Sequence, residues 1–348
     1  MLDDLEFLTR HDPSGMTRLT AAFPEQVRQA HEIASQSQIT SPVQQVRNIV
    51  VTGLGGSAAG GDLLAALSLA EGKVPVYVNR DYSIPHWADG STLVFACSYS
   101  GNTEETLAAY TDAKAKGCSL FVVTSGGMLL QQAGEDGVES VIVPGGQPPR
   151  TALGYMLVPL LVVCEKLGLI DSQNWEDVFA SLNQISARTG PEKPQAENLA
   201  KQLAHEFVNK FPVLYGSGVI EYAVAQRWRG QLNENAKVLC LTHSYPELCH
   251  NEILGWEGSG SQGVTSFTGV LLSANPVSDQ MAKRIAVTAE LLAGRIKFQK
   301  VEGTGGTTLA RILTLCHFAD WLSLYIAALN GVDPGQMDAI DTLKRRLL

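Results

Sequence analysis

The stretch Thr92-Leu93-Val94-Phe95-Ala96-Cys97-Ser98-Tyr99-Ser100-Gly101-Asn102-Thr103-Glu104-Glu105-Thr106 contains an apolar run, a turn rich in hydroxyl groups and the start of a helix. The apolar run is typical of a strand buried inside a parallel sheet. The acids Glu104 and Glu105 suit the first turn of a helix. The order of strand, turn and helix therefore predicts one repeat of a parallel α/β fold.

The turn itself predicts an anion site. It holds the hydroxyls of Ser98, Ser100 and Thr103. The first backbone N–H groups of a helix have no partner inside the helix, and they attract anions. A single Ser or Thr here is more often an ordinary helix cap. Three hydroxyls exceed what a cap needs, so we interpret the turn as a pocket for a phosphate monoester.

A second strand and glycine turn precede this segment, at Ile49-Val50-Val51-Thr52-Gly53-Leu54-Gly55-Gly56-Ser57. Gly55 and Gly56 let the backbone approach a ligand closely, and Ser57 adds a hydroxyl at a helix start. The glycine spacing also loosely fits a dinucleotide fingerprint. The acid that this fingerprint requires is best matched by Glu71, which lies in a segment typical of a helix end. The lysine of a P-loop is missing as well.

Composition restricts the possible partners. The chain has 348 residues and a formal net charge of −9, which argues against a nucleic-acid-binding protein. The six cysteines show no C-x-x-C spacing, so neither a zinc cage nor a disulfide framework is expected. The first residues are acidic where a secretory signal would be basic, and no apolar stretch reads as long and uninterrupted enough to span a bilayer. We therefore expect a cytoplasmic protein with no membrane partner.

The rest of the chain alternates strands and helices. Further strands are predicted at 74–78, 119–123, 139–143, 211–218, 264–272 and 296–301, and helices at 151–169, 174–188, 221–235, 276–295 and 307–329. The polar segment 190–194 marks a boundary. The glycine turn at 216–218 repeats the design of the first half. The pattern predicts an α/β protein with two doubly wound, flavodoxin-like parallel sheets related by internal duplication.

Three polar residues are candidates for chemistry. Glu234 ends a predicted helix, His250 lies in a polar loop, and Arg150 follows the last strand of the first half. A carboxylate and an imidazole can serve as base and acid. Taken alone, Glu234 is more often a solvated glutamate and Arg150 a surface ion-pair partner, while for His250 the two interpretations are evenly matched.

Several of these segments, in this order, resemble one family. They are Gly53-Leu54-Gly55-Gly56-Ser57, Ser98-Tyr99-Ser100-Gly101-Asn102-Thr103-Glu104-Glu105-Thr106, Pro148-Pro149-Arg150, Asn233-Glu234-Asn235-Ala236-Lys237 and His250-Asn251-Glu252. Together they are similar to the bifunctional phosphoglucose/phosphomannose isomerases, which are built from two sugar isomerase (SIS) domains. The resemblance runs from about Ile49 to the C-terminus. It implies a helical segment at 1–40, a phosphosugar-binding SIS domain at 41–190 and a second SIS domain at 191–348.

The resemblance also implies roles for individual residues. The phosphate-binding hydroxyls are those of Ser57, Ser98, Ser100 and Thr103, and the pocket backbone is that of Gly55 and Gly56. Glu234 matches the base that moves a proton between C1 and C2. His250 matches the residue that opens the sugar ring, donated across a homodimer interface. Arg150 matches the cation near the enediolate, and Lys344 matches a terminal lysine of the pocket.

The activity implied is reversible conversion of glucose 6-phosphate, and of mannose 6-phosphate, to fructose 6-phosphate, with no metal or other cofactor. Two alternatives stay open from the sequence. One is an isomerase of another phosphosugar, such as an amino sugar or a pentose phosphate. The other is a sugar-phosphate-binding regulator without catalytic activity, because SIS domains also occur in such proteins.

Overall fold

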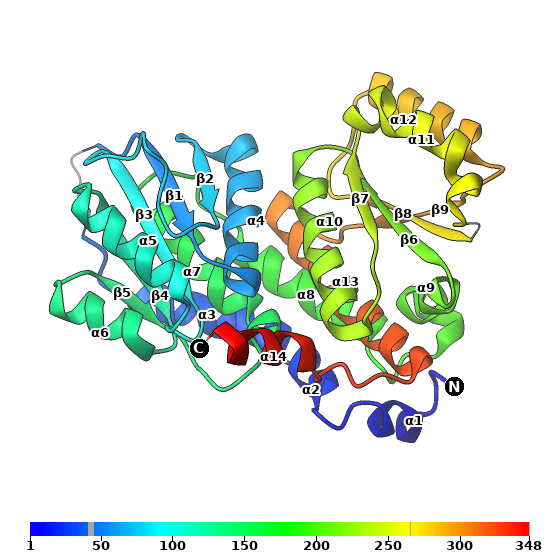
Figure 1. Cartoon of the computed structure of the whole chain (residues 1–348), viewed down its shortest axis with the longest axis horizontal. Coiled ribbons are helices and arrows are strands. Elements are labelled where there is room, and N and C mark those ends of the chain that lie inside the picture. Colours follow the sequence, from blue (N-terminus) through cyan, green and yellow to red (C-terminus); the bar gives the residue numbers. More distant parts are fainter. Residues whose placement is uncertain (41–44, 265, 348) are drawn as a thin grey trace. The chain divides into compact units, whose positions relative to one another are not determined.

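The computed structural model describes residues 1–40, 45–264 and 266–347. The chain divides into two compact units, one made of residues 22–175 and the other of residues 1–21 together with the chain from 176 onward. We name them the five-stranded unit and the four-stranded unit after their sheets (Figure 1).

The five-stranded unit is a parallel sheet covered by helices. Its strands are β1 (Asn48–Thr52), β2 (Val76–Asn79), β3 (Thr92–Ser98), β4 (Ser119–Thr124) and β5 (Ser140–Ile142). Its helices are α3 (Phe23–Gln36), α4 (Gly55–Glu71), α5 (Glu104–Ala115), α6 (Gly127–Glu135), α7 (Leu153–Lys166) and the short 3₁₀ turn η1 (Pro149–Thr151). The strand order is β2-β1-β3-β4-β5, with every pair parallel. This flavodoxin-like order, with its reversal between β1 and β3, confirms the fold class predicted for this half.

Both faces of the central strands β1 and β3 are buried, which explains their continuous apolar character. All seven residues of β3 are buried. On β1, Val51 faces α4, where a Cβ added to Gly61 would lie 2.8 Å from the Val51 side chain, so the glycine is needed for the close approach. Glu71 is the last residue of α4, as expected of a helix end and not of a nucleotide-binding strand.

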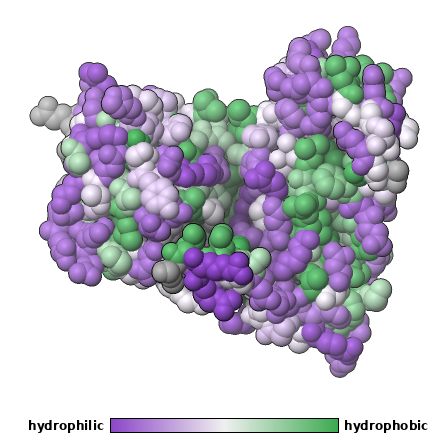
Figure 2. All heavy atoms as spheres, viewed as in Figure 1, coloured by the Kyte–Doolittle hydropathy of each residue, from purple (hydrophilic) through white to green (hydrophobic). Residues whose placement is uncertain are grey.

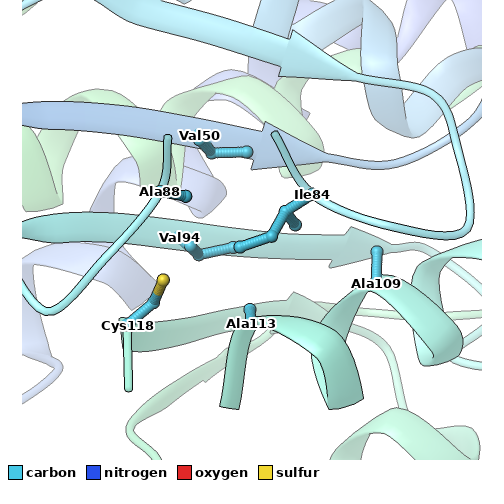
Figure 3. Close-up of a cluster of buried hydrophobic side chains, with 7 residues drawn as sticks. All are labelled: Val50, Ile84, Ala88, Val94, Ala109, Ala113 and Cys118. Atoms are coloured by element: carbon cyan, nitrogen blue, oxygen red, sulfur yellow. The ribbon is translucent and has the colours of Figure 1, made fainter. Parts of the chain in front are cut away.

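A cluster of small apolar side chains holds α5 on the opposite face (Figure 3). Its members come from β1, β3, α5, the segment between β2 and β3, and the residue before β4. They are Val50, Ile84, Ala88, Val94, Ala109, Ala113 and Cys118. The alanines of α5 allow the helix to lie close to the strands. The packing therefore fixes the helix that begins directly after the hydroxyl-rich turn.

The four-stranded unit repeats this plan. Its strands are β6 (Phe211–Gly216), β7 (Leu241–Ser244), β8 (Phe267–Ser273) and β9 (Phe298–Glu302), in the parallel order β7-β6-β8-β9. Its helices are α1 (Leu5–Arg10), α2 (Met16–Ala21), α8 (Trp175–Thr189), α9 (Leu199–Phe207), α10 (Val219–Gln231), α11 (Glu252–Gly258), α12 (Asp279–Leu292), α13 (Thr308–Asn330) and α14 (Asp338–Leu347). Short turns are η2 (Gln195–Glu197), η3 (Leu232–Ala236), η4 (Glu247–His250) and η5 (Ser259–Gln262). The shared strand order confirms the second parallel sheet.

Most predicted elements are present, with differences at their ends. The predicted strand 264–272 corresponds to β8, and its residue Thr265 lies outside the described residues. The sequence did not predict β7, because Leu241 is the only aliphatic residue among its four. The domain limits at 41–190 and 191–348 stay a prediction, since the first begins among residues outside the described ranges and contacts assign almost all of α8 to the four-stranded unit.

The helix α13 corrects one expectation. It has 23 residues and is apolar enough, by length and composition alone, to cross a membrane, whereas the sequence had suggested no such stretch. However, 94% of its most apolar window is buried inside the structure, as in the core helix of a globular domain. The visible face of the molecule carries mainly hydrophilic side chains, with smaller hydrophobic areas between them (Figure 2).

Candidate functional site

The predicted phosphate turn lies at the topological switch point of the five-stranded sheet. Strands β1 and β3 are parallel neighbours, with Thr52 opposite Ala96, so the turns that follow them leave the same edge of the sheet. Open α/β sheets bind ligands at this position, where the strand order reverses. The structure therefore brings the two glycine- and serine-rich segments of the sequence together.

Hydrogen bonds join the two turns and shape the second. The backbone N–H of Tyr99 donates to Ser57 Oγ at 3.1 Å, which ties the start of α4 to the turn after β3. Ser98 Oγ accepts from the N–H of Gly101 at 3.1 Å and lies 2.9 Å from Thr103 Oγ1. These bonds place the hydroxyls of Ser57, Ser98 and Thr103 around one turn of backbone.

The hydroxyls differ in exposure. Ser57 and Ser98 are 5% and 1% exposed, Thr103 is half-buried and Ser100 is exposed. Gly101 has φ +70°, and a Cβ there would lie 1.8 Å from the Gly126 carbonyl oxygen, so only glycine fits. The steric requirement at Gly101 therefore fixes the path of the turn, and its hydroxyls range from fully buried to solvent-exposed.

Arg150 lies at the same edge. A Cβ added to Gly56 would lie 2.5 Å from the Pro149 carbonyl oxygen and 3.2 Å from the Arg150 backbone nitrogen. The turn η1 thus packs directly on the start of α4, and Arg150 is 1% exposed. Gly55, with φ +53°, is exposed beside it. The five-stranded unit therefore assembles every predicted site residue that it contains.

Glu234 belongs to the four-stranded unit, in the π-helical turn η3 that follows α10. It is half-buried. Lys237, which follows η3 directly, has a left-handed conformation with φ 57°, and its Nζ donates to the carbonyl oxygens of Glu234 at 2.6 Å and Gln336 at 2.8 Å. Single π turns in helices are frequent at functional sites. The base predicted from the sequence thus sits on an irregular but well-bonded turn.

His250 ends the 3₁₀ turn η4 and is exposed. The residues after it are anchored: Asn251 Oδ1 accepts from the N–H of Glu252 at 2.6 Å, and the Tyr215 hydroxyl donates to the Glu252 carboxylate. Burial, together with this carboxylate, raises the pKa of Tyr215, so the phenol stays protonated. Trp256 Nε1 donates to the Tyr215 oxygen at 2.9 Å. The segment that follows the exposed His250 is therefore held by several side-chain hydrogen bonds.

Lys344 is an exposed residue of α14, a helix whose described residues are all partly or fully exposed. It shares the four-stranded unit with Glu234 and His250. The grouping of these three residues with the hydroxyl turn and Arg150 stays a prediction. Within the described ranges, the structure contains no group of three His, Cys, Asp or Glu side chains arranged to hold a metal ion.

Sequence reasoning missed Glu221, which occupies the switch point of the four-stranded sheet. Its Oε1 accepts from the N–H groups of Ala274 at 3.1 Å and Asn275 at 3.2 Å, and the residue is 4% exposed. These N–H groups follow β8 just as the Tyr99 N–H follows β3. The available signal was an acid in the first turn of a helix that follows a Ser-Gly turn.

Comparison with known proteins decides the family. Residues 196–347 match the bacterial phospho-glucose isomerase C-terminal SIS domain. Over 328 residues the chain is 41% identical to the bifunctional phosphoglucose/phosphomannose isomerase of Caldicellulosiruptor bescii, covering 93% of this chain and 96% of that protein. The chain belongs to the bifunctional phosphoglucose/phosphomannose isomerase family. The resemblance carried by the serine turn and the Glu234 and His250 segments is thereby confirmed.

Two further proteins are similar to this chain, one in sequence and one in structure. D-glucosamine-6-phosphate 4-epimerase of Sulfolobus acidocaldarius is 30% identical over 259 residues, covering 72% of this chain and 76% of that protein. The crystal structure of a glucose-6-phosphate isomerase like protein from Thermus thermophilus has a TM-score of 0.63 and 21% identity, covering 99% of this chain and 98% of that one. This second likeness shows the fold alone.

Proposed function

We propose that this isomerase family member interconverts glucose 6-phosphate and fructose 6-phosphate, and mannose 6-phosphate and fructose 6-phosphate, through an enediolate. The observation that carries the proposal is the cluster of hydroxyls at the switch point between β1 and β3, in a chain of this family. The cluster supplies donors without a lysine. It therefore suits the phosphate shared by all three substrates, which lies far from the carbons that differ between them.

Phosphate binding orients the sugar. Ser57, Ser98, Ser100 and Thr103 donate to the phosphate, helped by the free N–H groups at the start of α5. In the bond between Ser98 Oγ and Thr103 Oγ1 one hydroxyl donates its single proton and the other can turn toward an anion. When this bond opens, the second hydroxyl can also donate to the phosphate. Binding energy from this remote group positions the reacting carbons and lowers the entropic part of the barrier.

Proton transfer is assigned to the four-stranded unit. The Glu234 carboxylate takes the proton from C2 of the open-chain aldose and returns it to C1, while the hydroxyl proton of O2 passes to O1. Together these transfers move the carbonyl from C1 to C2. Arg150 stabilises the negative charge that develops on the enediolate oxygens. His250, from the partner protomer of a homodimer, moves the proton that opens the ring, and Lys344 closes the pocket. The site as a whole acts in the cytoplasm on a small sugar phosphate.

The assignment is tested with the variant Glu234→Gln, assayed on both hexose 6-phosphates in a coupled assay. Removing the base while keeping the shape should lower kcat by about 10²- to 10⁴-fold and leave KM nearly unchanged. Glu290→Gln, which changes an exposed glutamate of α12, is the matched control and should retain wild-type turnover. Near-normal kcat in Glu234→Gln would show that another group is the base.

A second candidate follows from the relative described as a D-glucosamine-6-phosphate 4-epimerase. A panel containing glucosamine 6-phosphate beside the two hexose 6-phosphates separates the candidates by kcat/KM. We expect the two hexose 6-phosphates to be converted and glucosamine 6-phosphate to be unchanged. Binding of fructose 6-phosphate without turnover of any sugar would instead favour the non-catalytic regulator.

A further inference from the structure

Five buried polar side chains join α10 and η3 to the long helix α13, and we call them the polar ladder. They are Arg227 and Gln231 of α10, Asn235 of η3, and Asp320 and Ser323 of α13. Their exposed fractions run from 0% to 6%. The members on the α10 side recur every four residues, which places them on one face of the helix.

The ladder holds the helix on both sides of Glu234. On the N-terminal side, the Asp320 carboxylate accepts from Arg227 Nη2 at 2.9 Å and from the Gln231 amide. On the C-terminal side, Asn235 Nδ2 donates to Ser323 Oγ at 2.9 Å, and Ser323 Oγ donates to the Asp320 carbonyl oxygen at 2.8 Å. Gln231 precedes η3 and Asn235 directly follows Glu234. Each end of the short segment that carries the base is therefore attached to α13.

Stability alone does not account for the ladder. The same two helices already pack through apolar rings, with Trp228 and Phe318 stacked at 5.5 Å between centroids. Burial raises the pKa of Asp320 against the opposing charge of Arg227, which reflects the desolvation of the carboxylate. Apolar side chains of similar volume are commonly as stabilising as a buried ion pair, or more so. Apolar contacts have no preferred direction, whereas these hydrogen bonds define one register of α10 and η3 on α13.

We propose that the polar ladder is a positioning device that sets the register of α10 and η3 on α13 and thereby aims the Glu234 carboxylate at the substrate. This inference rests on the proposed role of Glu234 as the base. A π turn places its side chains differently from a regular helix. The bonds of Gln231 and Asn235 to α13 hold this turn from outside α10. Displacing a catalytic group by about 1 Å costs on the order of 100-fold in rate.

The test replaces the ion pair with apolar side chains, in the triple variant Arg227→Met, Gln231→Leu and Asp320→Leu. We expect a folded protein whose urea midpoint equals or exceeds that of wild type, with kcat lowered about 100-fold and KM for glucose 6-phosphate within about threefold. Deuterium uptake from D₂O into the hexose phosphate should fall in parallel with kcat, because it reports proton transfer directly. A kcat within threefold of wild type in the folded triple variant would overturn the proposal.

A second variant covers the case in which the triple variant does not fold. Ser323→Ala removes the attachment of Asn235, and Trp228→Phe is the matched control because it removes a hydrogen bond to the Leu315 carbonyl oxygen between the same two helices. We expect kcat to fall about tenfold in Ser323→Ala and to stay near wild type in Trp228→Phe, at similar urea midpoints. Equal kcat in the two variants would contradict the ladder. Wild-type kcat in Glu234→Gln would instead refute the base itself, which keeps the two failures distinguishable.

Discussion

The two switch points of the molecule share a geometry but differ in the group that accepts the backbone N–H. In the five-stranded unit, the Tyr99 N–H after β3 donates to the neutral hydroxyl of Ser57. In the four-stranded unit, the Ala274 N–H after β8 donates to the carboxylate of Glu221. The two sites occupy equivalent positions in the strand registers of their sheets. Each accepting residue also lies against a glycine that precedes it: a Cβ added to Gly53 would contact Ser57, and one added to Gly216 would contact Glu221.

This difference suggests why one sheet would bind phosphate and the other would not. A hydroxyl that accepts one N–H can still donate to an anion, and other donors surround it. The Glu221 carboxylate brings its own negative charge and accepts from two N–H groups. It therefore takes the place of an external anion and repels a second one. By this account, the duplicated fold keeps one ligand site and converts the other into a structural bond.

The largest effect is expected when a carboxylate like that of Glu221 is placed at the switch point of the five-stranded sheet, in the variant Ser57→Glu. A negative charge beside the hydroxyl turn should raise the KM for glucose 6-phosphate about a thousandfold, because juxtaposed like charges cost several kcal/mol. Initial rates over a range of substrate concentrations give KM. Ser57→Gln, of the same size without the charge, is the control and should be affected much less. Equal KM values for the two variants would mean that the phosphate binds elsewhere.

The reciprocal change, Glu221→Ala, should affect stability and leave the substrate site intact. It leaves the N–H groups of Ala274 and Asn275 without their acceptor, which should cost about 3 kcal/mol of unfolding free energy. Hydrogen exchange measured by mass spectrometry should show lost protection at the end of β8. Glu221→Gln keeps an acceptor and should lose less than half as much. A raised KM in Glu221→Ala at normal kcat would show that this switch point also serves the substrate.

Acid should weaken the four-stranded unit through His317 of α13. Burial lowers the pKa of this fully buried imidazole to about 3, so the folded protein keeps it neutral while the unfolded chain, with a pKa near 6.5, binds a proton. The contribution of neutral His317 to the free energy of unfolding is fully present above about pH 6.5 and is lost progressively as the pH falls toward 3. Between pH 7 and pH 5 the loss should be about 2 kcal/mol.

Urea unfolding at pH 7 and pH 5 measures this loss, with His317→Gln as the comparison. The variant has no imidazole to protonate, so its free energy of unfolding should fall by about 2 kcal/mol less than that of wild type over the same range. An identical pH dependence in both proteins would exclude His317 as the cause of the acid sensitivity.

The smallest effect is expected from a pair of serines that end equivalent strands, Ser98 of β3 and Ser273 of β8. Ser98→Ala removes a hydroxyl that we propose donates to the phosphate, and it should raise the KM for glucose 6-phosphate about tenfold. Ser273→Ala, at the switch point already occupied by Glu221, should leave KM unchanged. If both variants raised KM equally, the two switch points would not differ in function.

The hydroxyl-rich turn between a strand and a helix could be predicted from the sequence because its signals are local, whereas its binding of phosphate stays a prediction. Ser57, Ser98 and Thr103 follow apolar strands, and neighbouring parallel strands bring their ends together at one edge. A glycine in such a turn, as at Gly101, already indicates in the sequence a position where a side chain would not fit. Both parallel sheets were predictable for the same reason, since strand and helix periodicities differ.

The remaining features depend on contacts between distant segments. Glu221 accepts from backbone N–H groups 53 and 54 residues away, and a backbone group carries no sequence signature. The π turn η3 follows a normal helical sequence, and the bond of its Asn235 to Ser323 on α13 was not visible in the local pattern. The strand β7 is short and half-polar, so its pairing with β6 defines it better than its composition does.

The central claim is that each chain binds one phosphate ester, at the hydroxyl turn after β3. Isothermal titration of Glu234→Gln with fructose 6-phosphate measures the stoichiometry without turnover, and hydrogen exchange on the same sample locates the ligand. The account predicts one equivalent per chain, with new protection in peptides that cover residues 98–104. A second equivalent, or protection at 273–279 in place of 98–104, would contradict it.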